Sequence, residues 1–187
     1  MKTLKESILK SVKAGKYSKY SLFPETKKEL IKMIKKEIKE KGLNCDLNHI
    51  DTSEIKDMSF LFANHTEGYG FGNFNGDISK WDVSNVKTMK SMFEKSYFNQ
   101  PINDWNVSSV ENMSFMFLWT KEFNQPLDKW NVSNVKHMTG MFQGARIPFN
   151  QDISMWKINS NCNTSGMFDN CNIKEEYKPF KNGKRII

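Results

Sequence analysis

The chain has 187 residues, of which 38% are hydrophobic, and its formal net charge is +7. This length is enough for one domain with a sizeable core, and 14 Phe, 11 Met and 5 Trp exclude a disordered composition. No apolar run approaches the roughly 20 residues that cross a bilayer, so we expect no membrane insertion.

The positive charge is concentrated near the N-terminus. Residues 1–42 contain 13 Lys and 5 Glu, whereas residues 43–187 contain 15 Lys or Arg and 16 Asp or Glu. The first residues also lack the apolar stretch of about 7–15 residues that a secretory signal requires. We therefore expect a cytoplasmic or virion-associated protein, and not one displayed on a cell surface.

Residues 1–23 form a basic N-terminal arm. One face of a short helix would be apolar, because four apolar residues recur at i, i+4, i+5 and i+8: Leu4, Ile8, Leu9 and Val12. A helix of this length is marginal by itself in water. We expect the arm to order on a surface, which is either the body of this protein or a docking partner.

Residues 24–42 carry the strongest helical pattern of the chain. Apolar residues recur at helical spacing from Leu30 to Ile38, and Gly42 is a typical residue just beyond a helix C-terminus. We expect an amphipathic helix that caps the domain. Its Lys-rich face is either solvated or a contact for nucleic acid.

Residues 43–171 consist of a repeat of about 25 residues. Four clear copies begin at Phe74, Phe98, Phe123 and Phe149, and a degenerate copy begins at Leu43. The clear copies contain Phe-Asn-x-x-Ile/Leu, then a Trp, then Met-x-x-Met-Phe, except that Thr164 replaces the first Met of the last copy. The first part predicts a short strand, and the last part predicts one helical turn, because its apolar residues lie at i, i+3 and i+4.

This period predicts an α/β repeat solenoid of about five turns, each a short strand plus a one-turn helix. Residues 172–187 would form a C-terminal cap, in which Asn182-Gly183 indicates a small hairpin.

The repeated Asn and Ser residues are either a ligand-binding row or ladders of hydrogen bonds that satisfy the backbone of the turns. We favour the ladders.

The run Phe-Asn-Gln-Asp-Ile-Ser-x-Trp-x-Val-Ser-Asn-Val-x-x-Met-x-x-Met-Phe resembles the BspA-like leucine-rich repeat, also described as the mycoplasma lipoprotein-associated repeat of unknown function. It stands here as Phe74–Phe93, Phe98–Phe117, Phe123–Phe142 and Phe149–Phe168. The resemblance implies a leucine-rich-repeat-like solenoid used for protein interaction in bacteria or phage. It brings no catalytic residues with it.

No constellation of residues indicates chemistry. The three cysteines, Cys45, Cys162 and Cys171, form no CxxC pair, which favours free thiols in a reducing compartment. His49, His65 and His137 fall in different phases of the repeat. We predict no catalytic, cofactor-binding or metal-binding residues, and hence no enzyme.

Candidate partner contacts lie where the repeat leaves residues free. Trp119 breaks the repeat phase, and Tyr69 and Phe71 lie in a Gly-rich insertion. The variable position before each Trp adds four more: Lys80, Asp104, Lys129 and Met155.

The leading hypothesis is a non-enzymatic protein–protein interaction module. The alternatives are a component of a larger assembly, such as a phage particle, docked through the arm, and a nucleic-acid-associated protein that uses the basic segment.

Overall fold

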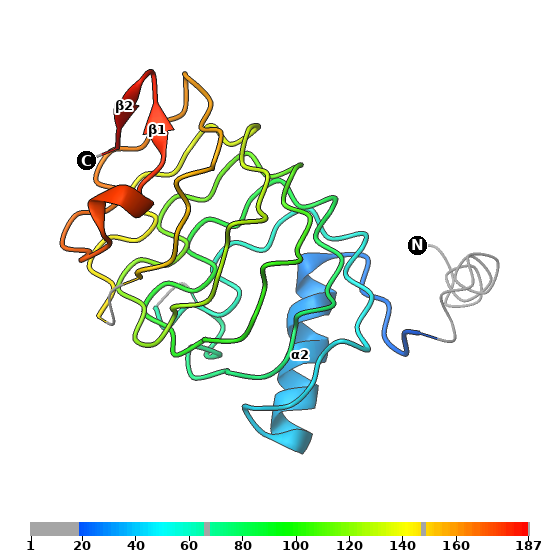
Figure 1. The fold of residues 1–187 in the computed structure, drawn as a ribbon. Helices are drawn as coiled ribbons and strands as arrows, with labels where there is room; N and C mark the ends of the chain where they lie inside the picture. The colour runs from blue at the N-terminus through cyan, green and yellow to red at the C-terminus, as the bar shows by residue number, and fades with distance from the viewer. Residues whose placement is uncertain (1–18, 66–67, 147–148, 187) are drawn as a thin grey trace.

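The structure is a computed structural model that describes residues 19–65, 68–146 and 149–186. Its elements are α2 (Lys27–Lys41), the 3-10 helix η2 (Glu175–Tyr177), and an antiparallel hairpin of β1 (Phe180–Lys181) and β2 (Lys184–Arg185). Between them the chain winds through stacked loops, and Figure 1 shows α2 and the hairpin at opposite ends of this stack. Residues 1–18 of the predicted arm, which include Leu4, Ile8, Leu9 and Val12, lie outside the described residues.

The predicted α/β solenoid of short strands and one-turn helices is wrong. Within 43–171, the described residues form neither strands nor helical turns, and only isolated single-residue bridges are present. The Met-x-x-Met segment does not become helical because its third residue is left-handed, as at Ser91 (φ 54°) and Gly140 (φ 58°). The segment closes as a tight turn instead, with the Met92 N–H donating to the Met89 carbonyl at 3.1 Å, three residues away.

Successive copies are joined by backbone hydrogen bonds from alternate residues of this turn segment. The amides of Met89, Ser91, Phe93 and Lys95 donate to carbonyls of the next copy at N···O distances of 2.9, 3.0, 2.9 and 2.8 Å. One parallel bridge per copy runs beside these bonds, linking in turn Asp57, Thr88, Asn112, His137 and Asn163. Because half of the amides point along the stack, they are not available for a helix.

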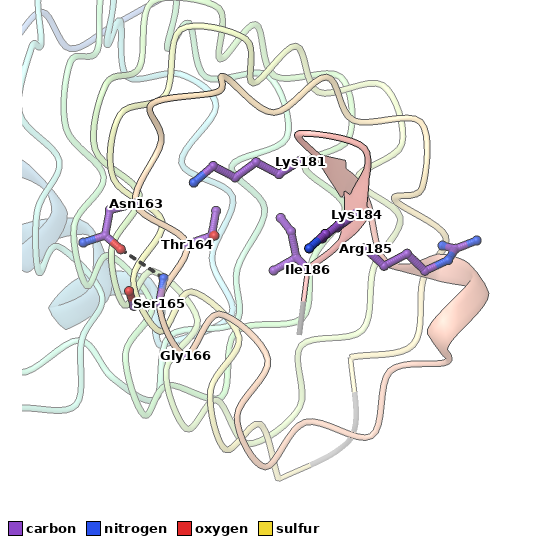
Figure 2. A pocket seen from close by; sticks show the side chains of 8 residues that line it. All are labelled: Asn163, Thr164, Ser165, Gly166, Lys181, Lys184, Arg185 and Ile186. Atoms are coloured by element: carbon purple, nitrogen blue, oxygen red, sulfur yellow. Dashed lines mark hydrogen bonds between the residues drawn. The ribbon is translucent and has the colours of Figure 1, made fainter.

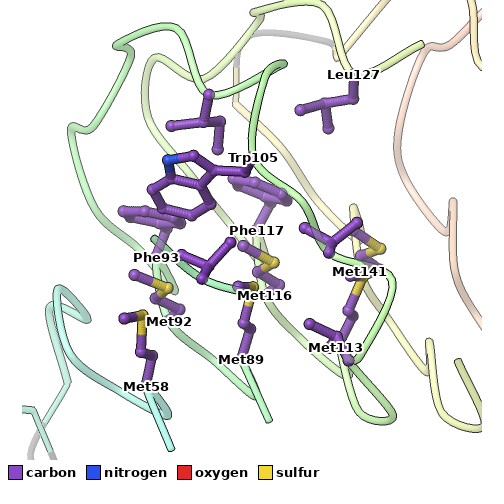
Figure 3. Close-up of a cluster of buried hydrophobic side chains, with 14 of the residues drawn as sticks. Met58, Met89, Met92, Phe93, Trp105, Met113, Met116, Phe117, Leu127 and Met141 are labelled. Carbon is purple, nitrogen blue, oxygen red and sulfur yellow. The ribbon is translucent and has the colours of Figure 1, made fainter. Parts of the chain in front are cut away.

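The core is a set of side-chain columns that run along the stack. Phe93, Phe117 and Phe142 stack face to face with ring centroids 5.6 and 5.4 Å apart, and methionines from neighbouring copies lie alongside them (Figure 3). Each repeat Trp is buried and donates its indole N–H to the preceding copy, as Trp105 does to the Ile78 carbonyl at 3.1 Å. This bond explains why Trp, and not Phe, recurs there.

The repeated Asn residues are structural. The Asn75 side-chain oxygen accepts the Asn99 N–H at 2.8 Å, and the Asn99 oxygen accepts the Asn124 N–H at 3.1 Å. Asn150 and Lys174 continue this ladder at 3.0 and 3.1 Å. The repeated Ser residues close local turns, since each donates to the Asp or Asn two residues before it. These contacts support the ladder interpretation over a ligand-binding row.

The first copy is covered by α2 and by the residues that precede it. The helix begins at Lys27, later than Pro24, because Thr26 and Glu29 form a capping box. Leu30 and Ile34 are completely buried against the core. The Leu22 carbonyl accepts the Asp51 N–H at 2.8 Å, so this segment adds one further rung to the stack.

The last copy is closed by residues 172–186. The hairpin indicated by Asn182-Gly183 is present, and both turn residues have the positive φ (51° and 75°) that a two-residue hairpin loop of type I′ requires. Ile186 returns from β2 into the core, where it is buried.

Candidate functional site

The described residues hold no group of three or more His, Cys, Asp or Glu side chains that could bind a metal ion. His49 is engaged with the buried Glu37 carboxylate, with Nε2 3.0 Å from Oε2.

The three thiols are free, as the sequence predicts, and burial raises the pKa of each: Cys45, Cys162 and Cys171. Raised pKa values leave them mostly as unreactive thiols at neutral pH.

Trp119 lies on the surface and is held there by the backbone. It is 49% exposed and has a left-handed φ of 51°. Its backbone N–H donates to the Gln143 carbonyl at 2.9 Å, and the Lys95 Nζ lies 5.0 Å from the centre of the indole ring. The indole lies over Gly144, where an added Cβ would collide with it.

The Gly-rich insertion presents Tyr69 but not Phe71. Tyr69 is exposed, and the Lys27 Nζ of α2 lies 5.7 Å from its ring centre. Phe71 is only 4% exposed and packs against Phe62 with ring centroids 6.4 Å apart. Phe71 therefore belongs to the core, and its prediction as a partner contact is wrong.

The variable position before each Trp forms a second surface at another corner of the stack. Lys80 and Asp104 are exposed, and Met155 is 81% exposed. The Lys129 Nζ donates to the Asp104 Oδ1 at 2.7 Å, and this hydrogen bond raises the pKa of Lys129. Lys129 and Met155 also line an open cleft of about 430 Å³ together with Trp130.

A third surface was not predicted from the sequence. It is a pocket of about 350 Å³ between the last copy and the hairpin, and Figure 2 shows the side chains that line it. The last copy provides Asn163, Thr164, Ser165 and Gly166, and the hairpin region provides Lys181, Lys184, Arg185 and Ile186. We call this the basic end pocket.

One signal for this pocket is present in the sequence. Thr164 occupies the position of Met89, Met113 and Met138 in the preceding copies. A Met in that column is covered by the next copy, whereas Thr164 has no following copy and is partly exposed. A polar residue at the end of an apolar column thus marks an exposed end of the stack.

Among the described residues, no helix is long and apolar enough to cross a membrane. A comparison with protein families finds a match to a family model described as "Mycoplasma protein of unknown function, DUF285", over residues 28–147 and again over residues 68–180. No curated protein and no solved structure was found to match the chain.

Proposed function

Since the chain belongs to the Mycoplasma protein family of unknown function DUF285, we propose that it is a non-enzymatic protein-binding module whose partner contacts the surface around Trp119. The family match covers the repeats, and the resemblance of these repeats to BspA-like proteins agrees with a role in protein interaction. The observation that carries the proposal is the exposed and fixed position of Trp119.

The Trp119 backbone joins the stack, but its side chain is not one of the repeated core side chains. The equivalent positions in the other copies are Lys95, Gly144 and Asn170, which share its left-handed backbone but not its side chain. A large aromatic side chain in this conformation is uncommon and costs conformational energy. The repeat does not require it, so a role in contacting a partner accounts for it best.

The position of Trp119 also suits a binding hot spot. Its ring is supported along the stack by Gly144 and by the Lys95 ammonium, so little side-chain freedom would be lost on binding. Trp is the residue type most enriched among hot spots, and truncation of such a residue costs about 2 kcal/mol or more of binding free energy.

The test begins by identifying the partner through crosslinking in the native host, and then measures its affinity for purified variants. We expect Trp119→Ala to weaken binding about 30-fold, which corresponds to 2 kcal/mol. Met155→Ala, which removes the most exposed apolar side chain of the other corner, should leave affinity within a factor of two or so. Equal effects of both substitutions would contradict the proposal.

A matched pair of glycine substitutions separates ring position from stability. Gly140 and Gly144 have nearly the same φ, 58° and 61°, so an Ala strains the backbone equally at either site. Ala at 144 displaces the Trp119 ring, whereas Ala at 140 presses on Phe115. We expect only Gly144→Ala to weaken partner binding to the extent that Trp119→Ala does.

The alternative roles are tested with the same assay. Because Ser21 and Leu22 are hydrogen-bonded to His49, a deletion that leaves the stack intact should end at residue 18. Loss of partner binding in this deletion, with Trp119→Ala harmless, would favour docking through the arm. A steep fall of affinity for nucleic acid with salt would favour the basic segment.

A further inference from the structure

The basic end pocket contains two backbone N–H groups whose equivalents in every earlier copy donate hydrogen bonds to the next copy. In the copy before it, the Met138 and Gly140 amides donate to the Asn163 and Ser165 carbonyls at 2.7 and 3.0 Å. The equivalent residues of the last copy are Thr164 and Gly166. Their amides have no acceptor within the part of the chain that the structure describes.

The local backbone keeps the form of a repeat that still has a neighbour. Gly166 has the left-handed φ of 61° seen at Gly140, and the Met167 N–H donates to the Thr164 carbonyl at 3.1 Å. Turns of this kind direct alternate N–H groups to one side, where they form a concave site for an anion. Both Thr164 and Gly166 line the pocket.

The opposite wall of the pocket is cationic. Lys181 reaches from β1 towards the last copy, where its ammonium donates to the Cys162 carbonyl and keeps two further protons for a ligand (Figure 2). Lys184 is exposed, and its ammonium makes no hydrogen bond or ion pair with a described residue. None of the lining residues is acidic.

Two neighbouring groups limit the site. Arg185 points away from it in Figure 2, since its guanidinium donates to the Glu176 and Lys178 carbonyls at 3.0 and 2.7 Å. The Asp169 carboxylate lies beside Gly166, within 2.8 Å of where a Cβ would stand. The ligand-binding charge thus comes from Lys181 and Lys184, and Asp169 limits the site on one flank.

We propose that the basic end pocket binds an oxyanion, a phosphate or carboxylate group. The Thr164 and Gly166 amides and the Lys181 and Lys184 ammonium groups donate to its oxygens, and the Thr164 and Ser165 hydroxyls lie in reach of the same space. At about 350 Å³ the pocket is larger than one such group, so it accommodates an oxyanion carried on a larger molecule. The site involves none of the residues around Trp119 and does not depend on the proposed protein-binding function.

The test follows the backbone amides by NMR while inorganic phosphate is added to the full chain at constant ionic strength. The Thr164 and Gly166 signals should shift and saturate. The Met138 and Gly140 signals provide an internal control, because the same turn geometry is present there but the amides are already bonded. These control signals should stay in place.

Charge removal at the pocket should weaken this binding. We expect Lys184→Gln to raise the phosphate concentration at half-saturation about three- to tenfold, because a charge-assisted hydrogen bond is lost. Lys157→Gln is the matched control, because it also removes one exposed Lys charge from the same copy. Lys157 lines the cleft beside Lys129 and Met155 and is not part of the basic end pocket. This control should leave the half-saturation point unchanged.

Two further titrations distinguish the source of the oxyanion. Saturation by phosphate at lower concentration than by a short Glu peptide supports a phosphate-bearing ligand, and the reverse order supports an acidic segment of a protein. The proposal is overturned if neither probe saturates the Thr164 and Gly166 shifts. It is also overturned if Lys184→Gln and Lys157→Gln bind phosphate equally well.

Discussion

The two ends of the repeat stack are closed in different ways. At the first copy, Leu22 adds a backbone rung next to Ile50, and Leu30 and Ile34 of α2 cover the apolar columns. The Lys27 ammonium binds the Asp57 carboxylate at 3.1 Å and the Ser59 hydroxyl at 2.7 Å. Backbone, apolar and charged groups therefore all contribute to the closure of this end.

The last copy is covered only in part. Lys174 continues the Asn ladder and the Tyr177 carbonyl accepts the Ile153 N–H, so these two columns are extended by the closing segment. The turn column at Thr164 and Gly166 is not extended and faces the basic end pocket. A stack of similar units must stop growing at both ends. This one stops with a helix at one end and with an open, cationic edge at the other.

The largest effect should follow from damage to the helix-covered end. Ile34 is completely buried between α2 and the first copy, and we expect Ile34→Ala to lower the free energy of unfolding by about 2–5 kcal/mol. Urea denaturation measures this change. Lys35→Ala on the exposed face of the same helix is the control and should shift stability by less than about 0.5 kcal/mol. An equal effect of the two would show that α2 does not stabilise the stack.

The corresponding change at the other end should be smaller. Ile186 is buried under the hairpin, but it lines the open pocket, where water can fill the space left by its side chain. We expect Ile186→Ala to cost about 1–2 kcal/mol, at the low end for a buried aliphatic residue. A cost above that of Ile34→Ala, measured in the same urea series, would mean that the hairpin stabilises the stack more than α2 does.

The repeat unit was predictable from the sequence, whereas its backbone conformation was not. Apolar residues at i, i+3 and i+4 fit a helical turn, but a tight turn with a left-handed third residue buries the same positions. Gly140 and Gly166 at that third position are the signal against a helix, since Gly is unfavourable there. Phe60, Ser91 and Phe115 hide this signal in the other copies, because non-glycine residues there also have positive φ.

The candidate partner contacts could likewise be predicted only in part from the sequence. Trp119 could be singled out because it departs from the repeat, and the structure leaves it half exposed. Phe71 could not be excluded, because only the folded insertion shows that this ring turns inwards onto Phe62. The basic end pocket joins Thr164 and Gly166 to Lys181 and Lys184, and these residues meet only when the hairpin folds back. The spacing of these four residues in the sequence does not indicate that they lie close together in the fold.

Loss of the helix cap should have an intermediate effect on the helix-covered end. The Thr26 side chain accepts the Glu29 N–H, and the Glu29 carboxylate accepts the Thr26 N–H in return. We expect Thr26→Ala to cost about 1 kcal/mol, within the 0.5–2 kcal/mol seen for N-cap residues. Thr26→Ser keeps the hydroxyl and should recover most of this loss in thermal unfolding. Equal loss in both variants would assign the effect to the methyl group instead of the cap.

The smallest effect should depend on pH and should be confined to the same helix. Burial of Glu37 opposes its ionisation, but a hydrogen bond from Lys41 and the contact with His49 outweigh burial and hold the pKa of Glu37 below its usual value. A carboxyl whose pKa is lower in the folded than in the unfolded chain adds stability above its unfolded pKa of about 4.3, and this stability is lost as the pH falls through the folded pKa. We therefore expect Glu37→Gln to cost about 0.5–1 kcal/mol near pH 7 and progressively less below about pH 4.3. Urea unfolding of both proteins between pH 3 and 7 measures the difference, and a cost that stays constant down to pH 3 would show that the charge of Glu37 does not stabilise α2.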